Sequence, residues 1–162
     1  MRASRKLIVM HSVRDGHFPG HFNDLKEVFA GLGSTLAPDV VFTHTLEDRH
    51  QDHRLVAELT WQTFRDHLIL EYEIPKYEGD LGRPNFYVPL SAATGRRKID
   101  HLMRYFPSQH AKDWYRSGTF SATLQLRGLE CRAPDGFAEA YVARKLVCGT
   151  LNRHRQRPIK AE

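Results

Sequence analysis

Three histidines and several acidic residues lie close together between His44 and His53. His50 and His53 are three residues apart, so on a helix both imidazoles would leave the same face. Neutral imidazole is the commonest metal ligand in proteins and the side chain best suited to proton transfer near pH 7. The segment therefore predicts a site for a divalent metal with acid–base chemistry, in which Asp52 orients an imidazole.

A plainer interpretation of this segment is the solvated start of a helix. Acidic side chains favour the first turn of a helix because they interact with its macrodipole. Isolated histidines at such a position carry no functional meaning. The clustering of His50 and His53 with Asp48 and Asp52 next to a strand end supports the site, and both interpretations stay open.

The pattern of apolar residues predicts the elements that position these histidines. Residues 40–43 predict a buried strand, and apolar residues at a period near 3.6 predict a helix that begins near Asp48 or His50. Upstream, residues 7–10 predict another buried strand, and Asn23 predicts the N-cap of a helix. This order predicts a parallel βαβ unit with the histidines at the carboxyl ends of its strands, where open α/β sheets bind ligands.

The second half of the chain predicts further strands and helices. In order, they are a strand over 67–74, an extended segment over 86–90, a helix from Ser91, a helix over 120–127 and a last strand over 138–147. Glu73, Lys76 and Tyr77 belong to the end of the first of these strands and its charged loop, so they are candidate polar contacts of a pocket wall. A loop solvated by its charges is the alternative, above all for Lys76.

The sequence His50-Gln-Asp-His53-Arg54, after Phe42-Thr-His44, resembles the second signature of the LmbE/PIG-L family of zinc-dependent de-N-acetylases. The resemblance continues through 63–77, 79–82, 108–109, 127–128 and 138–145. It implies an α/β fold, a Rossmann-like three-layer sandwich with a mostly parallel sheet, over residues 1–150. The family's first signature, an AHPDD-type turn with further metal ligands and the general base, does not occur in the sequence. The implied domain is therefore N-terminally incomplete, without its first strand and metal turn.

The resemblance also implies roles for individual residues. His53 would be a ligand of Zn²⁺ or another divalent metal, His50 the general acid, and Asp52 its tuning partner. Asp15 would contact sugar hydroxyls, although an Asp-Gly turn with a local backbone role explains it equally well. Gln109 would lie near the site, since Ser108-Gln109 matches the family's Ser-Gln.

The implied reaction is hydrolysis of an N-acetyl group on an amino sugar or related sugar conjugate, so the expected partner is a small-molecule amide. The alternative is a non-catalytic, truncated fragment of such a deacetylase, with a metal site too incomplete to retain the ion. Without its first strand, the sheet would have an unpaired edge, which favours homo-oligomers.

Composition narrows the class of protein. The net charge of +5 belongs to the ends, because residues outside the two termini hold 17 bases and 18 acids. Residues 151–162 form a basic tail, which we interpret as solvated, so no nucleic-acid partner is expected. A basic nucleic-acid-binding module is a third interpretation, and it rests on the tails alone. The sequence shows no bilayer-spanning apolar stretch and no signal-peptide pattern, so we expect a cytoplasmic protein. Cys131 and Cys148 predict free thiols.

Overall fold

The computed structural model describes residues 7–147. The helices are η1 (Phe18–His21), α1 (Phe22–Thr35), α2 (Gln51–Thr63), α3 (Ala92–Tyr105), η2 (Pro107–Gln109) and α4 (Ser117–Glu130). The strands are β1 (Val40–His44), β2 (Leu68–Tyr72), β3 (Phe86–Leu90) and β4 (Phe137–Val142). They form a 4-stranded sheet in the order β1-β2-β4-β3.

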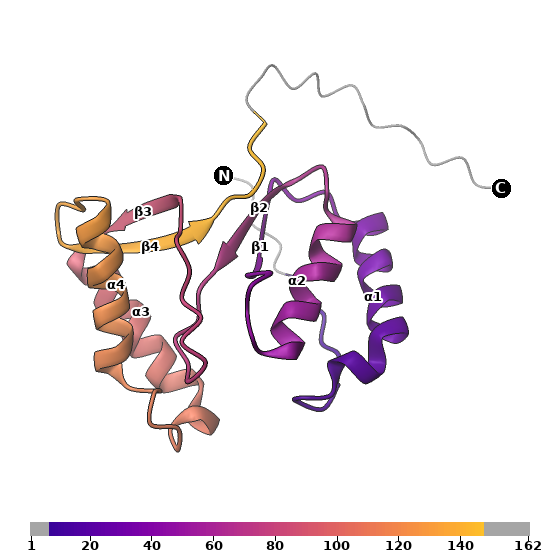
Figure 1. The fold of residues 1–162 in the computed structure, drawn as a ribbon, viewed down its shortest axis with the longest axis horizontal. Coiled ribbons are helices and arrows are strands. Elements are labelled where there is room, and N and C mark those ends of the chain that lie inside the picture. The colour runs from indigo at the N-terminus through magenta and orange to yellow at the C-terminus, as the bar shows by residue number, and fades with distance from the viewer. Residues whose placement is uncertain (1–6, 148–162) are drawn as a thin grey trace.

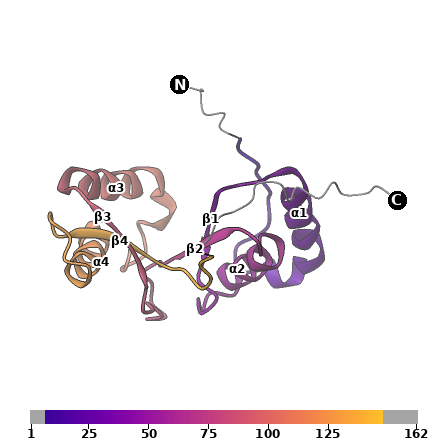
Figure 2. The same ribbon diagram turned by 90° about the horizontal axis from the view of Figure 1, so that it is seen from above.

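The molecule has two ends that are joined through the sheet. Figures 1 and 2 show α1 and α2 with β1 and β2 at one end, and α3 and α4 with β3 and β4 at the other. Between the ends, β2 and β4 share a short antiparallel ladder with the pairs Glu71↔Val142 and Tyr72↔Tyr141. The two ends therefore depend on few backbone contacts for their relative position.

The mixed α/β class is confirmed, whereas the mostly parallel sheet is not. Among the described strands, β1 and β2 are parallel, but β4 runs antiparallel to both β2 and β3. The reason lies in the connection through α3 and α4, which brings the chain back between β2 and β3 in the opposite direction. Strand direction of this kind depends on long-range packing and not on the apolar pattern of the strand itself.

The strand–loop–helix unit around the histidines forms as predicted. β1 spans Val40–His44 and α2 begins directly after His50. On the inner face of α2, Leu55 and Leu59 are buried together with Leu25 of α1. This packing of α1 on α2 fixes the amino end of α2 against the end of β1.

Two predictions in the first forty residues are wrong. Residues 7–10 form no strand, and their exposed fractions are 72%, 79%, 51% and 87%. A strand requires a hydrogen-bonded neighbour, and within residues 7–147 this segment pairs with none. The helix α1 begins at Phe22 with His21 at its N-cap, so Asn23 lies inside the first turn.

Later boundaries differ from the predictions in smaller ways. Ser91 caps α3 as predicted, since its hydroxyl accepts a hydrogen bond from the amide of Thr94 at 3.2 Å. The predicted helix over 120–127 is longer and spans Ser117–Glu130, while the last strand ends at Val142.

Cys131 is a free cysteine. Cys148 and the basic tail over 151–162 lie outside the described residues. No helix within residues 7–147 is long and apolar enough to cross a membrane.

Candidate functional site

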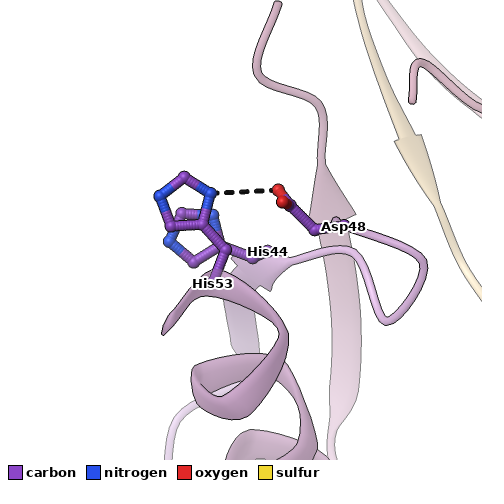
Figure 3. Close-up of side chains that lie close together, drawn as sticks. All are labelled: His44, Asp48 and His53. Carbon is purple, nitrogen blue, oxygen red and sulfur yellow. Dashed lines mark hydrogen bonds and ion pairs between the residues drawn. The ribbon is translucent and has the colours of Figure 1, made fainter. Parts of the chain in front are cut away.

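The last residue of β1 and the first turn of α2 bring two imidazoles into contact. The rings of His44 and His53 stack with their centroids 3.9 Å apart and their planes at 7°. Figure 3 shows the two rings one above the other, with the carboxylate of Asp48 at their edge. The ring of His50 stacks on the other side, with its centroid 4.4 Å from that of His53. We refer to His44, Asp48, His50 and His53 as the histidine cluster.

Asp48 is the central acceptor of the histidine cluster and is only 1% exposed. Its Oδ1 accepts the backbone amide of His50 at 2.8 Å, which fixes the turn into α2. Its Oδ2 lies 3.0 Å from Nδ1 of His53 and 3.1 Å from Nζ of Lys76. Since a carboxylate can only accept, Nδ1 of His53 is the donor of this hydrogen bond.

His44 is held in its neutral form. Burial, followed by the nearby charge of His53, lowers the pKa of His44 to about 4. Its Nε2 lies 3.2 Å from the hydroxyl of Tyr72, whose own pKa is raised by burial and by the charge of Asp48. The other ring nitrogen, Nδ1, is buried and has no hydrogen-bond partner among the described residues. A buried ring nitrogen of this kind is available to a ligand.

Two groups of side chains have the composition of a metal site. The ligand atoms of His44, Asp48 and His53 lie within 4.8 Å of one another, and so do those of Asp15, His50 and Asp52. Imidazole nitrogen and carboxylate oxygen are the donors that Zn²⁺ and similar divalent ions accept. His50 also has a buried Nδ1 without a partner among residues 7–147. The first group is the more buried, because Asp15 in the second is exposed.

Asp52 holds the loop that precedes α1. Its Oδ2 accepts the backbone amide of Gly16 at 2.6 Å, and its Oδ1 accepts that of Phe18 at 3.1 Å. Gly16 has φ +78°, a conformation that favours glycine, so the predicted Asp-Gly turn at Asp15 is present. Asp52 therefore positions Asp15 next to His50. Asp52 also lies close to His50.

A cavity of about 880 Å³ opens from the histidine cluster between the two ends of the molecule. One wall comes from the sheet, including Phe42, Tyr72 and Tyr141, and the other from the α3–α4 end. The cavity is lined by seven of the eight residues that the sequence predicts for the site, namely Asp15, His50, His53, Glu73, Lys76, Tyr77 and Gln109. The remaining one, Asp52, is buried and does not line the cavity.

The predicted substrate-contact residues differ in the protein groups with which they already form ion pairs or hydrogen bonds. The side chain of Lys76 is only 7% exposed and joins Asp48 to Asp80, so it is not a solvated loop residue. Both oxygens of Glu73 are held by Arg127, at 2.7 and 2.9 Å. Tyr77 is 68% exposed, and its hydroxyl accepts the amide of Asp113 at 3.1 Å. Of these residues, only Lys76 reaches the histidine cluster.

Sequence reasoning assigned no role to His44 or Tyr72, and it named Asp48 only as an acidic neighbour of the histidines. His44 directly follows the predicted strand over 40–43 and ends β1, so its position at the carboxyl end was a usable signal. Tyr72 lies directly across from His44 in the parallel register of β1 and β2. That register, which places the hydroxyl on the imidazole, is not encoded in either strand alone.

Comparisons with known proteins give a fold and no family. No family model matches the sequence, and no curated protein matches it. A solved structure with a similar fold is GalB, the 4-carboxy-2-hydroxymuconate hydratase from Pseudomonas putida KT2440, with a TM-score of 0.54 and 14% sequence identity. The likeness covers 81% of this chain and 60% of the hydratase, so the chain spans less than two thirds of that protein's length. At this identity the likeness shows the fold alone.

Proposed function

We propose that this chain is a metal-dependent hydrolase that removes an N-acetyl group from an amino sugar or related conjugate, as its resemblance to the LmbE/PIG-L family implies. The observation that carries the proposal is the set His44, Asp48 and His53, whose ligand atoms lie within 4.8 Å of one another beside the cavity. The same resemblance implies a Rossmann-like three-layer sandwich with a mostly parallel sheet, to which β1, β2, α1 and α2 would belong.

The residues of the first group fit a divalent metal. Nδ1 of His44 is buried without a partner among the described residues, and burial keeps the ring neutral, as an imidazole ligand must be. His44, Asp48 and His53 would hold Zn²⁺ or a similar ion. When bound, such an ion polarises an amide carbonyl and lowers the pKa of a coordinated water to about 7.

His50 is the proposed general acid. It lines the cavity beside His53, so a substrate amide at the cluster lies within its reach. Expulsion of an amine requires a proton on the departing nitrogen, and an imidazolium is suited to deliver it. Asp15 and Asp52 each place a carboxylate oxygen within 4.8 Å of a ring nitrogen of His50, so this residue has two acidic neighbours.

Lys76 supplies the positive charge nearest to the histidine cluster. Its ammonium lies 3.1 Å from Asp48 and 2.8 Å from Asp80, and the residue lines the cavity. Negative charge develops on the carbonyl oxygen when water attacks an amide. A buried cation beside that oxygen stabilises the transition state more than it does in water.

The test compares His50→Gln with His101→Gln. His101 is an exposed residue of α3 that does not line the cavity, so it serves as the matched control. We expect the unaltered chain to bind Zn²⁺ or Co²⁺ and to release acetate from N-acetylated amino sugars. His50→Gln should retain the metal and lose acetate release by about a hundredfold or more, while His101→Gln changes neither. A protein that binds no metal, or a His50→Gln variant with full turnover, contradicts the proposal.

A further inference from the structure

The cavity extends over much more apolar surface than an acetamido group requires. Beyond the histidine cluster it is lined by Phe42 and Tyr141 of the sheet, Leu102 and Phe106 of the α3 segment, Trp114, and Leu124 of α4. Its volume of about 880 Å³ lies in the range of sites that enclose a whole drug-sized molecule. The part of the site that bears on substrate choice is therefore this apolar region.

Phe42 connects the apolar region to the histidine cluster. It precedes His44 by two residues in β1, so both side chains leave the same face of the sheet. The Phe42 side chain is among the exposed large apolar ones, with 57% exposed, and its ring centroid lies 5.4 Å from that of Tyr141. Tyr141 is half-buried, so it is mainly the exposed ring of Phe42 that gains free energy when a ligand covers it.

The charged groups in this part of the cavity are already neutralised by one another. Lys98 pairs with Glu139 across the α3–β4 contact. Arg127 pairs with Glu73 at 2.7 Å and with Glu130 at 2.7 Å, and it is only 4% exposed. The lining residues without an ion pair among the described residues are Asp15, Glu78 and Lys112, which are all exposed. The inner walls thus complement a neutral group, since a charged one would find no free partner there.

We propose that the substrate is an amphiphilic amide whose neutral, phenyl-sized apolar group binds between the Phe42–Tyr141 pair and the Leu102–Phe106 side of α3. The amide of the same molecule then reaches the histidine cluster. The position of the amide rests on the proposed function, whereas the apolar subsite rests on the cavity alone. The substrate class is therefore an N-acetylated compound with an aromatic or compact aliphatic substituent, rather than a free amino sugar.

The test measures binding by calorimetry with four probes in two pairs. The first pair is N-acetylglucosamine and its phenyl glycoside, and the second is glucose and its phenyl glycoside, which lack the amide. We expect the phenyl group to strengthen binding about tenfold or more in both pairs, because it covers the aromatic pair. Equal affinities within each pair, or no measurable binding of either phenyl glycoside, would overturn the proposal.

Matched variants locate the subsite. Phe42→Ser and Phe106→Ser remove exposed side chains that line the cavity, whereas Val40→Ser and Tyr105→Ser remove exposed neighbours that do not line it. The gain from the phenyl group should fall to less than about threefold in the first two variants and persist in the other two. An undiminished gain in Phe42→Ser and Phe106→Ser overturns the assignment. Acetate release is measured separately, so a protein that favours the phenyl glycosides but releases no acetate refutes the proposed function and retains the subsite.

Discussion

Two fully buried carboxylates, Glu71 and Asp48, are stabilised in different ways. Glu71 of β2 is 0% exposed and accepts Nε1 of Trp61 at 2.6 Å and Nε of Arg144 at 2.6 Å. Arg144 donates a second hydrogen bond to Glu71 at 2.9 Å. Asp48 is 1% exposed, but its side-chain partners are an imidazole and an ammonium group. Neither partner of Glu71 changes its protonation near neutral pH, whereas imidazole does.

The contrast separates a structural ion network from a candidate binding site. Around Glu71, the carboxylate accepts four hydrogen bonds and Arg144 is also paired with Glu47. Around Asp48, Lys76 is shared with Asp80, and the Nδ1 atoms of His44 and His50 lack partners among the described residues. A completed network stabilises the fold and has no capacity for a ligand. An incomplete one retains donors and lone pairs that a ligand can use.

The largest expected effect is a loss of stability when Glu71 loses its cation. Arg144→Met leaves a buried carboxylate without its charged partner, so the free energy of unfolding should fall by about 3 kcal/mol. Denaturant unfolding measures this change, with Lys145→Met as the neighbouring control. The double variant Glu71→Gln, Arg144→Met should regain at least about 1 kcal/mol, because no unpaired charge remains buried. If the free energy of unfolding of Arg144→Met falls by less than about 1 kcal/mol, the Glu71 network does not differ from the Asp48 site in the way proposed.

The histidine cluster should show the opposite behaviour. His53→Ala removes a proposed ligand, so Zn²⁺ affinity should fall by more than about a hundredfold. The stability of the metal-free protein should change by less than about 1 kcal/mol, since Lys76 remains on Asp48. Chelator competition measures the first quantity and unfolding in EDTA the second. If His53→Ala unfolds the protein as strongly as Arg144→Met, both carboxylates are structural.

Stability should depend on pH through His44. The pKa of His44 is lowered from 6.5 to about 4 in the folded protein, so between these values the unfolded chain binds more protons than the folded one. The free energy of unfolding of the metal-free protein should therefore rise with pH through this window and fall as pH drops from 6.5 to 4. Because the ring is part exposed, we expect about 2 kcal/mol. In His44→Gln, urea unfolding at pH 7 and pH 4.5 should show this difference reduced; an unchanged difference assigns it to other groups.

The smallest expected effects concern Lys76, and they have opposite signs in two variants. Lys76→Met removes a cation that competes for Asp48, so Zn²⁺ affinity should rise about tenfold while metal-free stability falls. Burial alone would raise the pKa of Asp80, yet hydrogen bonds from the amide of Arg49 and from Lys76 hold it below its usual value. Asp80→Asn removes this second anion, which leaves Lys76 with Asp48 and should weaken Zn²⁺ binding. Isothermal titration of both variants checks the signs; equal affinities would show that Lys76 does not compete.

Local patterns predicted the parts of the site that depend on one segment. The apolar run before His44 and the 3.6-residue period after His50 correctly predicted β1 and the start of α2. The rings of His50 and His53 stack on each other, but His50 is the extended N-cap of α2, so the prediction that both leave one face of the helix holds only for His53. These features depend on side-chain direction within an element, which the sequence specifies directly.

Features that depend on distant segments were not predictable from the same patterns. The contact of Tyr72 with His44 requires the register of β1 and β2, and the Lys76–Asp48 ion pair requires the loop after β2 to fold back on the site. Residues 7–10 have an apolar strand pattern but no neighbour to pair with among the described residues. The antiparallel direction of β4 follows from packing at the α3–α4 end. In each case a partner far along the chain decides the outcome.

The short ladder between β2 and β4 has a consequence for how the protein melts. Only two residue pairs join these strands, and Arg144, just after β4, reinforces the junction through Glu71. The cavity wall comes from both ends of the molecule, so a bound molecule bridges them independently of that ladder. Besides this ladder and the Arg127–Glu73 ion pair, few contacts join the ends, so we expect calorimetric heating of the empty protein to resolve two overlapping transitions. Saturation of the cavity should merge them into one sharper transition at higher temperature, because neither end can then open without losing the ligand.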